Sequence, residues 1–153
     1  MRPVAALLLG ATLASGACRH GAPPAPAPAA PAPAGPSLYT RLGGREAIRA
    51  VVGDFLGRVA ADRRINAFFR GVDTEELAGK LTDQLCQVTG GPCRYTGKPM
   101  REAHADMKIS DADFDALVED LAGSLDHFSV GPNEVRELLG ALGGLRRQIV
   151  TRR

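Results

Sequence analysis

Apolar side chains recur every three or four residues along most of the chain between residues 44 and 149. From residue 44 to residue 61 they are Ile48, Val51, Val52, Phe55, Leu56 and Val59, which share one face of a helix. Residues 77–88, 114–125 and 135–149 repeat this spacing. Nowhere do apolar and polar residues alternate with period two over a useful length, as a half-buried strand requires. The sequence therefore predicts an all-α domain with four main helices and no sheet.

Capping residues and helix breakers indicate where these helices begin and end. Asp73 precedes an acidic first turn, and the Gly-Gly-Pro sequence at 90–92 ends that helix. Ser110 and Asp113 have the spacing of a capping box, with Asp in place of the usual Glu. Pro132 is suited to the first position of the last helix. We expect that helix to continue to residue 149, although two glycines at 143–144 should weaken it or allow close packing.

Residues 90–105 carry less helical signal. The stretch 90–99 holds three glycines and two prolines and is predicted to be a loop. Residues 100–105 are predicted to form a short helical turn that contains His104. His104 therefore follows a flexible loop.

The first 36 residues have a different composition from the rest. Residues 1–18 have a short positive start, an apolar stretch and small residues before Cys18, as export signals do. Their end resembles the lipobox of bacterial lipoproteins, in which the cysteine becomes the acylated N-terminus. The alternative is an ordinary secretory signal cleaved near Ala17. Residues 19–36 form an Ala/Pro-rich linker with seven prolines, which favours an extended spacer. The folded domain is expected at 37–153.

The charge balance excludes some classes of function. The chain carries 19 Lys and Arg against 17 Asp and Glu, a formal net charge of +2. This excess is too small to argue for binding of nucleic acid. No stretch reaches the ~18 apolar residues that span a bilayer, so contact with a membrane is expected only through a lipid anchor at Cys18.

His104 is the most interesting candidate for chemistry. An isolated histidine on a short helix is usually structural or exposed, and no partner ligands lie around it at zinc spacing. Haem, however, supplies four equatorial nitrogens itself, so one histidine is enough to hold its iron.

The folded part resembles the group I truncated haemoglobins over nearly its whole length, from Ser37 to Val150. The resemblance rests on blocks that occur in the family's order and spacing. These blocks are Ser37–Gly44 (SLYTRLGG), Ala47-Ile48, Val51-Val52, Asp54-Phe55, Ala67–Phe69, Gly90–Pro92, Tyr95–Met100 (YTGKPM), Ala103-His104, and Ile109 with Asp111–Phe114.

The resemblance implies a truncated, two-over-two helical globin sandwich that holds haem b. It implies that His104 is the proximal ligand of the iron, that Phe69 packs on the haem, and that Lys80 reaches a haem propionate. Leu77 and Leu81 would lie on the distal helix face, on the opposite side from His104. The full set of expected cofactor contacts is Phe55, Leu56, Phe69, Leu77, Lys80, Leu81, Leu85, Tyr95, Met100, His104, Ile109, Phe114 and Leu117.

Two departures from the family's pattern bear on function. This chain has Leu56 where group I members usually carry Tyr, and Leu81 where they often carry Gln. The distal face of Leu56, Leu77 and Leu81 would then lack a hydrogen-bond donor for a bound gas. One such bond is worth on the order of 1.5–3 kcal/mol, so oxygen would leave roughly tenfold to hundredfold faster or more. Gln84 lies one turn further along the same helix, and it would supply a hydrogen-bond donor to the distal face if its side chain reached inward.

Three functions remain open on the sequence alone. The first is reversible binding of a diatomic gas, namely oxygen, nitric oxide or carbon monoxide, in an apolar distal pocket. The second is an enzyme, a nitric oxide dioxygenase or weak peroxidase, which would need a reductase partner. The third is a haem-free interaction domain, which the presence of His104 disfavours.

Cys86 and Cys93 form an even pair if Cys18 is acylated. An exported chain meets an oxidising compartment, where cysteines form disulfides. A bridge would join the end of the distal helix to the loop that leads to His104. The alternative is a buried Cys86 and a free Cys93. The expected location is the periplasmic face of a bacterial membrane, or the soluble periplasm.

Overall fold

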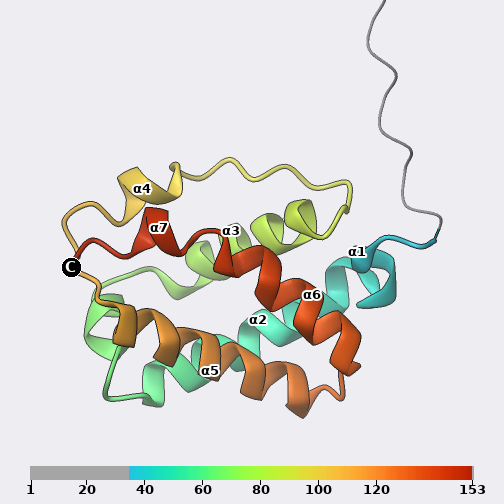
Figure 1. Cartoon of the computed structure of the whole chain (residues 1–153), viewed down its shortest axis with the longest axis horizontal. Helices are drawn as coiled ribbons and strands as arrows, with labels where there is room; N and C mark the ends of the chain where they lie inside the picture. Colours follow the sequence, from blue (N-terminus) through green and yellow to red (C-terminus); the bar gives the residue numbers. More distant parts are fainter. Residues whose placement is uncertain (1–34, 153) are drawn as a thin grey trace, which may run out of the picture. The chain divides into compact units, whose positions relative to one another are not determined.

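The computed structural model describes residues 35–152, and its helices are drawn in Figure 1. The signal and lipobox at 1–18 and nearly all of the linker lie outside the described residues. The elements are α1 (Leu38–Arg41), α2 (Gly44–Ala61), the 3₁₀ helix η1 (Asn66–Phe69), α3 (Thr74–Val88), α4 (Met100–Ala103), α5 (Asp111–His127), α6 (Pro132–Gly143) and α7 (Arg146–Ile149). The part of the chain from 35 to 152 contains no strand, which confirms the all-α prediction.

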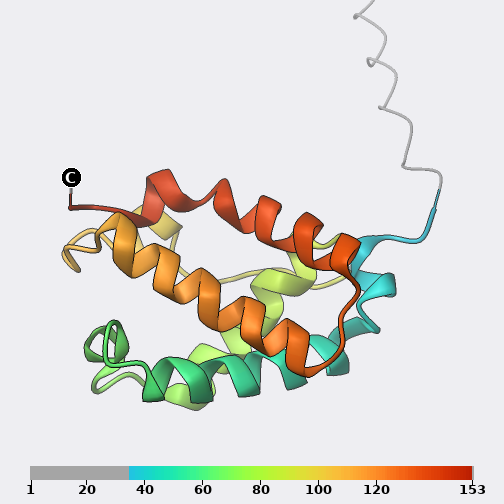
Figure 2. The same cartoon turned by 60° about the horizontal axis from the view of Figure 1, so that its bottom comes forward.

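The four long helices form two pairs. Helix α2 packs against α3 and also against α5, while α5 packs against α6. Figure 2 shows α5 and α6 side by side, with α2 running below α5. This is the two-over-two arrangement that the resemblance implies.

The core lies where the apolar faces of these helices meet. Val52 on α2, Leu125 on α5 and Leu138 on α6 are at most 2% exposed. All six apolar positions that the spacing predicts for α2 are buried. Burial of such faces, at roughly 25 cal/mol per Å² of apolar surface, is the main force that holds the pairs together.

Most local predictions are confirmed. Asp73 caps α3, with its side chain accepting a hydrogen bond from the Glu76 amide at 2.9 Å. Both bonds of the capping box are present at the start of α5, between Ser110 and Asp113. Each bond satisfies an amide that the first turn of a helix would otherwise leave without a partner.

The last helix was predicted wrongly as one continuous element. It ends as α6 at Gly143, and α7 begins at Arg146. Between them, the Leu145 amide donates to the Leu142 carbonyl at 2.9 Å, which makes a tight turn. Glycine destabilises a helix by about 1 kcal/mol relative to alanine, and two in succession allow the chain to turn here. The 3₁₀ helix η1 was not predicted.

Within the described region, no helix is long and apolar enough to cross a membrane.

Candidate functional site

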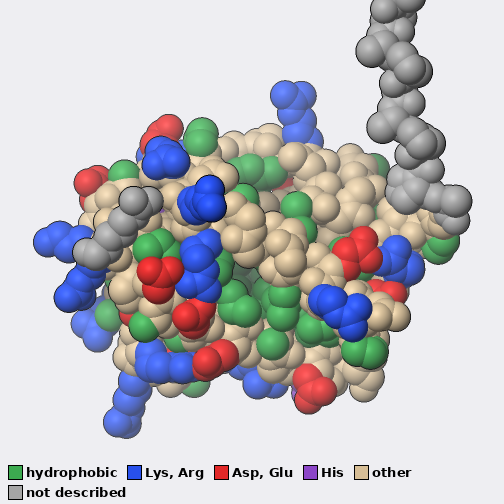
Figure 3. All heavy atoms as spheres, in the orientation of Figure 1, with side chains coloured by type: hydrophobic (Ala, Val, Ile, Leu, Met, Phe, Trp, Pro, Cys, Tyr) green, Lys and Arg blue, Asp and Glu red, His purple; other side chains and the backbone are tan. Residues whose placement is uncertain are grey.

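A cavity of about 570 Å³ lies between the two helix pairs. Voids in packed protein cores are far smaller, whereas ligand sites commonly reach this size. Its walls come from α2, η1, α3, α4, α5, α6 and α7 together with the loop before α4. Figure 3 shows apolar side chains gathered around a hollow near the middle of this face. The cavity therefore suits a ligand with a large apolar surface.

The structure brings together eleven of the thirteen residues expected to contact the cofactor. They are Phe55, Phe69, Leu77, Lys80, Leu81, Leu85, Tyr95, Met100, His104, Phe114 and Leu117. Leu56 does not line this cavity but a smaller one of about 280 Å³ that shares Phe69, Val72 and Leu77 with it. Ile109 is buried outside the cavity wall, in a cluster with Phe114 and Ile149.

Sequence reasoning missed several wall residues. Phe68 and Met107 lie on short or irregular segments that show no periodicity. Leu142, Leu145 and Ile149 reach the cavity from the far end of the chain. Their spacing on the last helix marks them as apolar, but the turn between α6 and α7 decides where they point.

His104 directly follows the single turn of α4. Its ring Nδ1 lies 2.7 Å from the carbonyl oxygen of Met100. A carbonyl can only accept a hydrogen bond, so Nδ1 carries a proton, and in the neutral form of the ring Nε2 keeps a free lone pair. Metal-bound histidines commonly have this partner, which fixes both the tautomer and the orientation of the ring. His104 is therefore prepared to bind a metal through Nε2.

In the described part of the chain, His104 does not belong to a metal-binding cluster of protein side chains. Among residues 35–152, no group of three or more His, Cys, Asp or Glu side chains could hold a metal ion. One histidine beside an apolar cavity fits an iron whose remaining ligands come from a macrocycle. The donor set and the cavity both fit haem.

The α3 wall of the cavity is mainly apolar. Leu77, Leu81 and Leu85 line it, and Gln84 is the amide among them. Gln84 Nε2 lies 3.2 Å from the Met100 sulfur, to which it donates. Gln84 therefore does reach inward, but its donor contacts the α4 side of the site.

Two lysines stand at the rim of the cavity. Lys80 Nζ lies 2.6 Å from Glu76, and this carboxylate raises the pKa of Lys80. Lys98 Nζ lies 3.8 Å from Glu102, and the sequence had not indicated Lys98. Both lysines are exposed, so they could exchange these partners for the carboxylates of a bound cofactor at little cost.

A disulfide joins Cys86, near the end of α3, to Cys93 on the following loop, with their Cα atoms 5.7 Å apart. A second contact joins this loop to α3, because the Tyr95 amide donates a hydrogen bond to Gln87 Oε1 at 2.7 Å. Gly91 lies between the two cysteines in the sequence. A Cβ atom at this position would come within 2.5 Å of Tyr39 and 2.6 Å of the Cys86 sulfur, so only glycine fits. The loop toward α4 is thus held tightly against the end of α3.

Comparison with known proteins shows the family of the chain. Residues 37–151 match the model of the bacterial-like globin family. The chain belongs to this family. A group 1 truncated haemoglobin of Mycolicibacterium paratuberculosis is 37% identical over 115 residues, which are 75% of this chain and 85% of the relative. One of Tetrahymena pyriformis is 34% identical over 114 residues, 74% of this chain and 94% of the relative.

Solved structures show the same fold. The Fe(III) form of the Tetrahymena pyriformis truncated haemoglobin superposes with a TM-score of 0.73 at 34% identity, covering 75% of this chain and 98% of that one. The 2/2 haemoglobin of Synechococcus sp. PCC 7002, in a cyanomet state with covalently attached haem, gives 0.73 at 32% identity, covering 76% and 100%. The chain is a truncated globin, and the cofactor of this globin is haem iron.

Proposed function

We propose that this globin binds a diatomic gas reversibly at a haem iron ligated by His104. The observation that supports it best is the 2.7 Å hydrogen bond from His104 Nδ1 to the Met100 carbonyl, which leaves Nε2 free at the edge of a large apolar cavity. When bound, haem supplies four equatorial nitrogens and an iron with a further position for a ligand.

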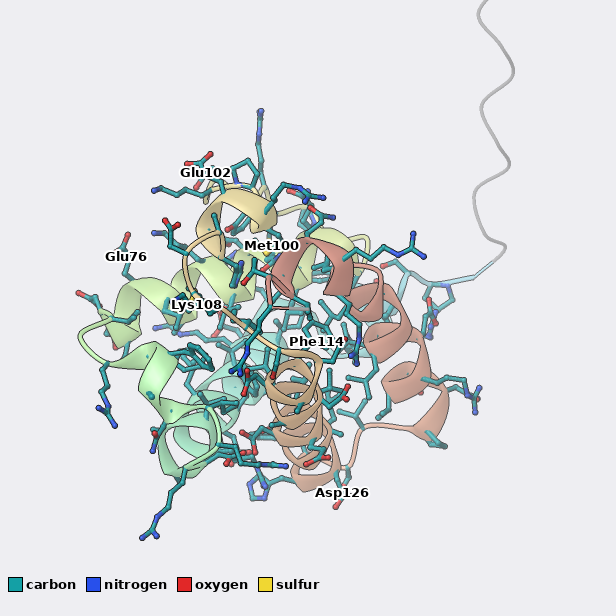
Figure 4. The ribbon with its side chains drawn as sticks, turned by 60° about the vertical axis from the view of Figure 1, so that its left-hand side comes forward. Glu76, Met100, Glu102, Lys108, Phe114 and Asp126 are labelled. Carbon is teal, nitrogen blue, oxygen red and sulfur yellow. A yellow bond between two sulfur atoms is a disulfide. The ribbon has the colours of Figure 1, made fainter. Side chains whose placement is uncertain are left out.

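The residues of the chain have separate tasks in this proposal. Met100 orients the ring of His104 through its carbonyl, and Figure 4 shows Met100 on α4, above the loop that carries Lys108. Phe69, Phe114 and Leu117 cover apolar surface of the cofactor and exclude water. Lys80 and Lys98 attract its carboxylates at the rim.

The α3 wall determines which gas is favoured. Leu77 and Leu81 cannot donate a hydrogen bond, and the hydrogen bond that Gln84 Nε2 donates goes to the Met100 sulfur. Oxygen gains stability from a donor near its partly negative charge, whereas nitric oxide and carbon monoxide depend on one less. We therefore expect weak, fast-exchanging oxygen and comparatively tighter binding of the other two gases.

An absorption spectrum of the purified protein tests the proposal. We expect a Soret band, and a shift of the ferrous spectrum on addition of carbon monoxide. A protein that folds but takes up no haem would contradict the proposal. Addition of nitric oxide to the oxygenated form distinguishes gas binding from the enzymatic alternative, because a dioxygenase would produce nitrate and ferric haem in one fast turnover.

We also propose that the globin is exported and anchored to a membrane through acylated Cys18. The support is the sequence alone: a signal-like segment ends in Cys18, and the Ala/Pro-rich linker can hold a domain away from a lipid surface. The alternative is a soluble periplasmic form. Full-length protein should sediment with membranes, and Cys18→Ser should release it. A Cys18→Ser variant that stays in the membrane fraction would overturn the lipid anchor.

A further inference from the structure

The backbone of Ile109 makes all of its described hydrogen bonds to the C-terminal end of the chain. Its amide donates to Thr151 Oγ1 at 3.1 Å. Its carbonyl accepts from the amides of Thr151, at 2.9 Å, and Arg152, at 2.8 Å. Ile109 is 7% exposed, and its bond to the Thr151 hydroxyl is partly buried. The polar groups of this buried peptide therefore depend on residues more than forty positions away.

Side chains reinforce the same contact. We call residues 146–152 the C-terminal clasp. Ile149 packs with Ile109 and Phe114 in one apolar cluster. The guanidinium of Arg146 lies over the Phe114 ring, 4.6 Å from its centre, and pairs with Asp111 at 2.8 Å and with Asp115. The clasp thus holds both the loop before α5 and the first turns of α5.

This loop connects directly to His104. Ile109 follows His104 by five residues, and α7 packs beside α4 (Figures 1 and 4). In the segment between His104 and Ile109, the Met107 amide donates a hydrogen bond to the His104 carbonyl at 3.2 Å. Lys108 has φ of 53°, a conformation that a residue with a side chain adopts only when its surroundings hold it there. Local structure alone does not fix this segment.

Helix α4 cannot hold His104 in place by itself. It has four residues, a single turn, and isolated turns of helix are unstable in water. Its position depends on the segments attached to its two ends. The disulfide-bonded loop holds the N-terminal end, and the contact with the clasp holds the C-terminal end.

We infer that the C-terminal clasp is a positioning element for His104, with Thr151 as its central side chain. The clasp sets the orientation of the ring toward the iron and slows escape of the cofactor. This inference rests on the proposed function, because it assumes that His104 ligates haem iron. Thr151 acts through Ile109 and the loop, without touching the cavity.

The test compares Thr151→Val with Thr151→Ser in the full chain loaded with haem. Valine keeps the shape but removes the acceptor of the buried Ile109 amide, while serine keeps the acceptor. We expect Thr151→Val to shift or broaden the iron–histidine stretching band in the resonance Raman spectrum of the ferrous form. Haem transfer to excess apomyoglobin should be about fivefold faster, the effect of one hydrogen bond. Serine should restore both values.

Arg41→Gln provides the control for a merely structural effect. It removes ion pairs to Glu134 and Glu137 between α1 and α6, away from the loop. It should lower the melting temperature without moving the Raman band. If Thr151→Val does not fold, Arg152→Pro tests the same contact by removing one amide donor to Ile109. If Thr151→Val, or Arg152→Pro in its place, has the same Raman band and the same haem transfer rate as the unmodified protein, the inference is wrong, although haem binding stands. Absence of the band in the unmodified protein would instead overturn the proposed function.

Discussion

The α3 wall of the cavity and the α4 side are held in place by different means. Helix α3 has 15 residues, its own cap at Asp73 and an apolar face that the sequence displays plainly. Helix α4 has four residues, and its histidine depends on a disulfide at one end and on the C-terminal clasp at the other. The α3 wall is thus a product of local sequence, whereas the α4 side, which carries His104, is assembled from distant segments. Substitutions on the two sides should therefore change different properties.

The largest effect is expected from His104→Ala. It removes the proposed iron ligand from the α4 side while the α3 wall stays intact. Haem affinity should fall by more than about 100-fold, since even outer partners of metal ligands are worth roughly 10- to 100-fold. Haem titration followed at the Soret band measures this. His127→Ala is the matched control, because His127 is exposed at the end of α5, outside the cavity. Equal loss in both variants would contradict the assignment.

Leu81→Gln tests the α3 side. It introduces a hydrogen-bond donor into an apolar wall, and one such bond to a bound gas is worth on the order of 1.5–3 kcal/mol. Oxygen dissociation should slow by roughly tenfold to hundredfold. Stopped-flow displacement of oxygen by carbon monoxide gives the rate. Leu81→Met, which adds no donor, should leave it nearly unchanged. An unaltered rate in Leu81→Gln would place the gas away from this part of the wall.

The disulfide connects the two sides, and its removal should weaken both together. Closing a loop of this length stabilises the folded state by about 2 kcal/mol in the chain-entropy model. Replacement of Cys86 and Cys93 by serine should lower the free energy of unfolding by that amount, as measured by urea denaturation. Reductant should produce a similar loss in the unmodified protein and none in the double variant. If reductant has no effect on the unmodified protein, the bond does not contribute to stability.

The smallest effect is expected outside both walls, at Asp120 on α5. Burial raises the pKa of this carboxyl, and its Oδ2 has no hydrogen-bond partner. Because the pKa is higher in the folded state, Asp120 favours folding below its unfolded pKa and loses this contribution as pH rises through the folded pKa. Asp120→Asn should therefore raise the free energy of unfolding slightly at neutral pH.

Thermal unfolding at pH 4 and pH 7 measures this difference. The gain from Asp120→Asn should shrink at the lower pH, while haem affinity stays unchanged at both. A gain that is equal at the two pH values would show that the charge of Asp120 is not its cause.

The sequence predicted the helices better than it predicted what joins them. The bounds of α2 and the caps of α3 and α5 follow from periodicity and from side chains a few residues away. The break between α6 and α7 was missed, because two glycines permit a turn without requiring one. Phe68 and Met107 were missed because short segments carry no period from which a face could be inferred.

The sequence by itself determined the helical fold, the apolar α3 face and the histidine to examine, since these depend on spacing along the chain. Only the tertiary structure decided that Leu56 lines a neighbouring cavity and that Gln84 donates to Met100. It also decided that Ile109 bonds to Thr151 and Arg152. These contacts join residues brought together by the packing of several helices, and no local pattern specifies such a meeting. For this reason the support of His104, unlike its presence, could be found only in three dimensions.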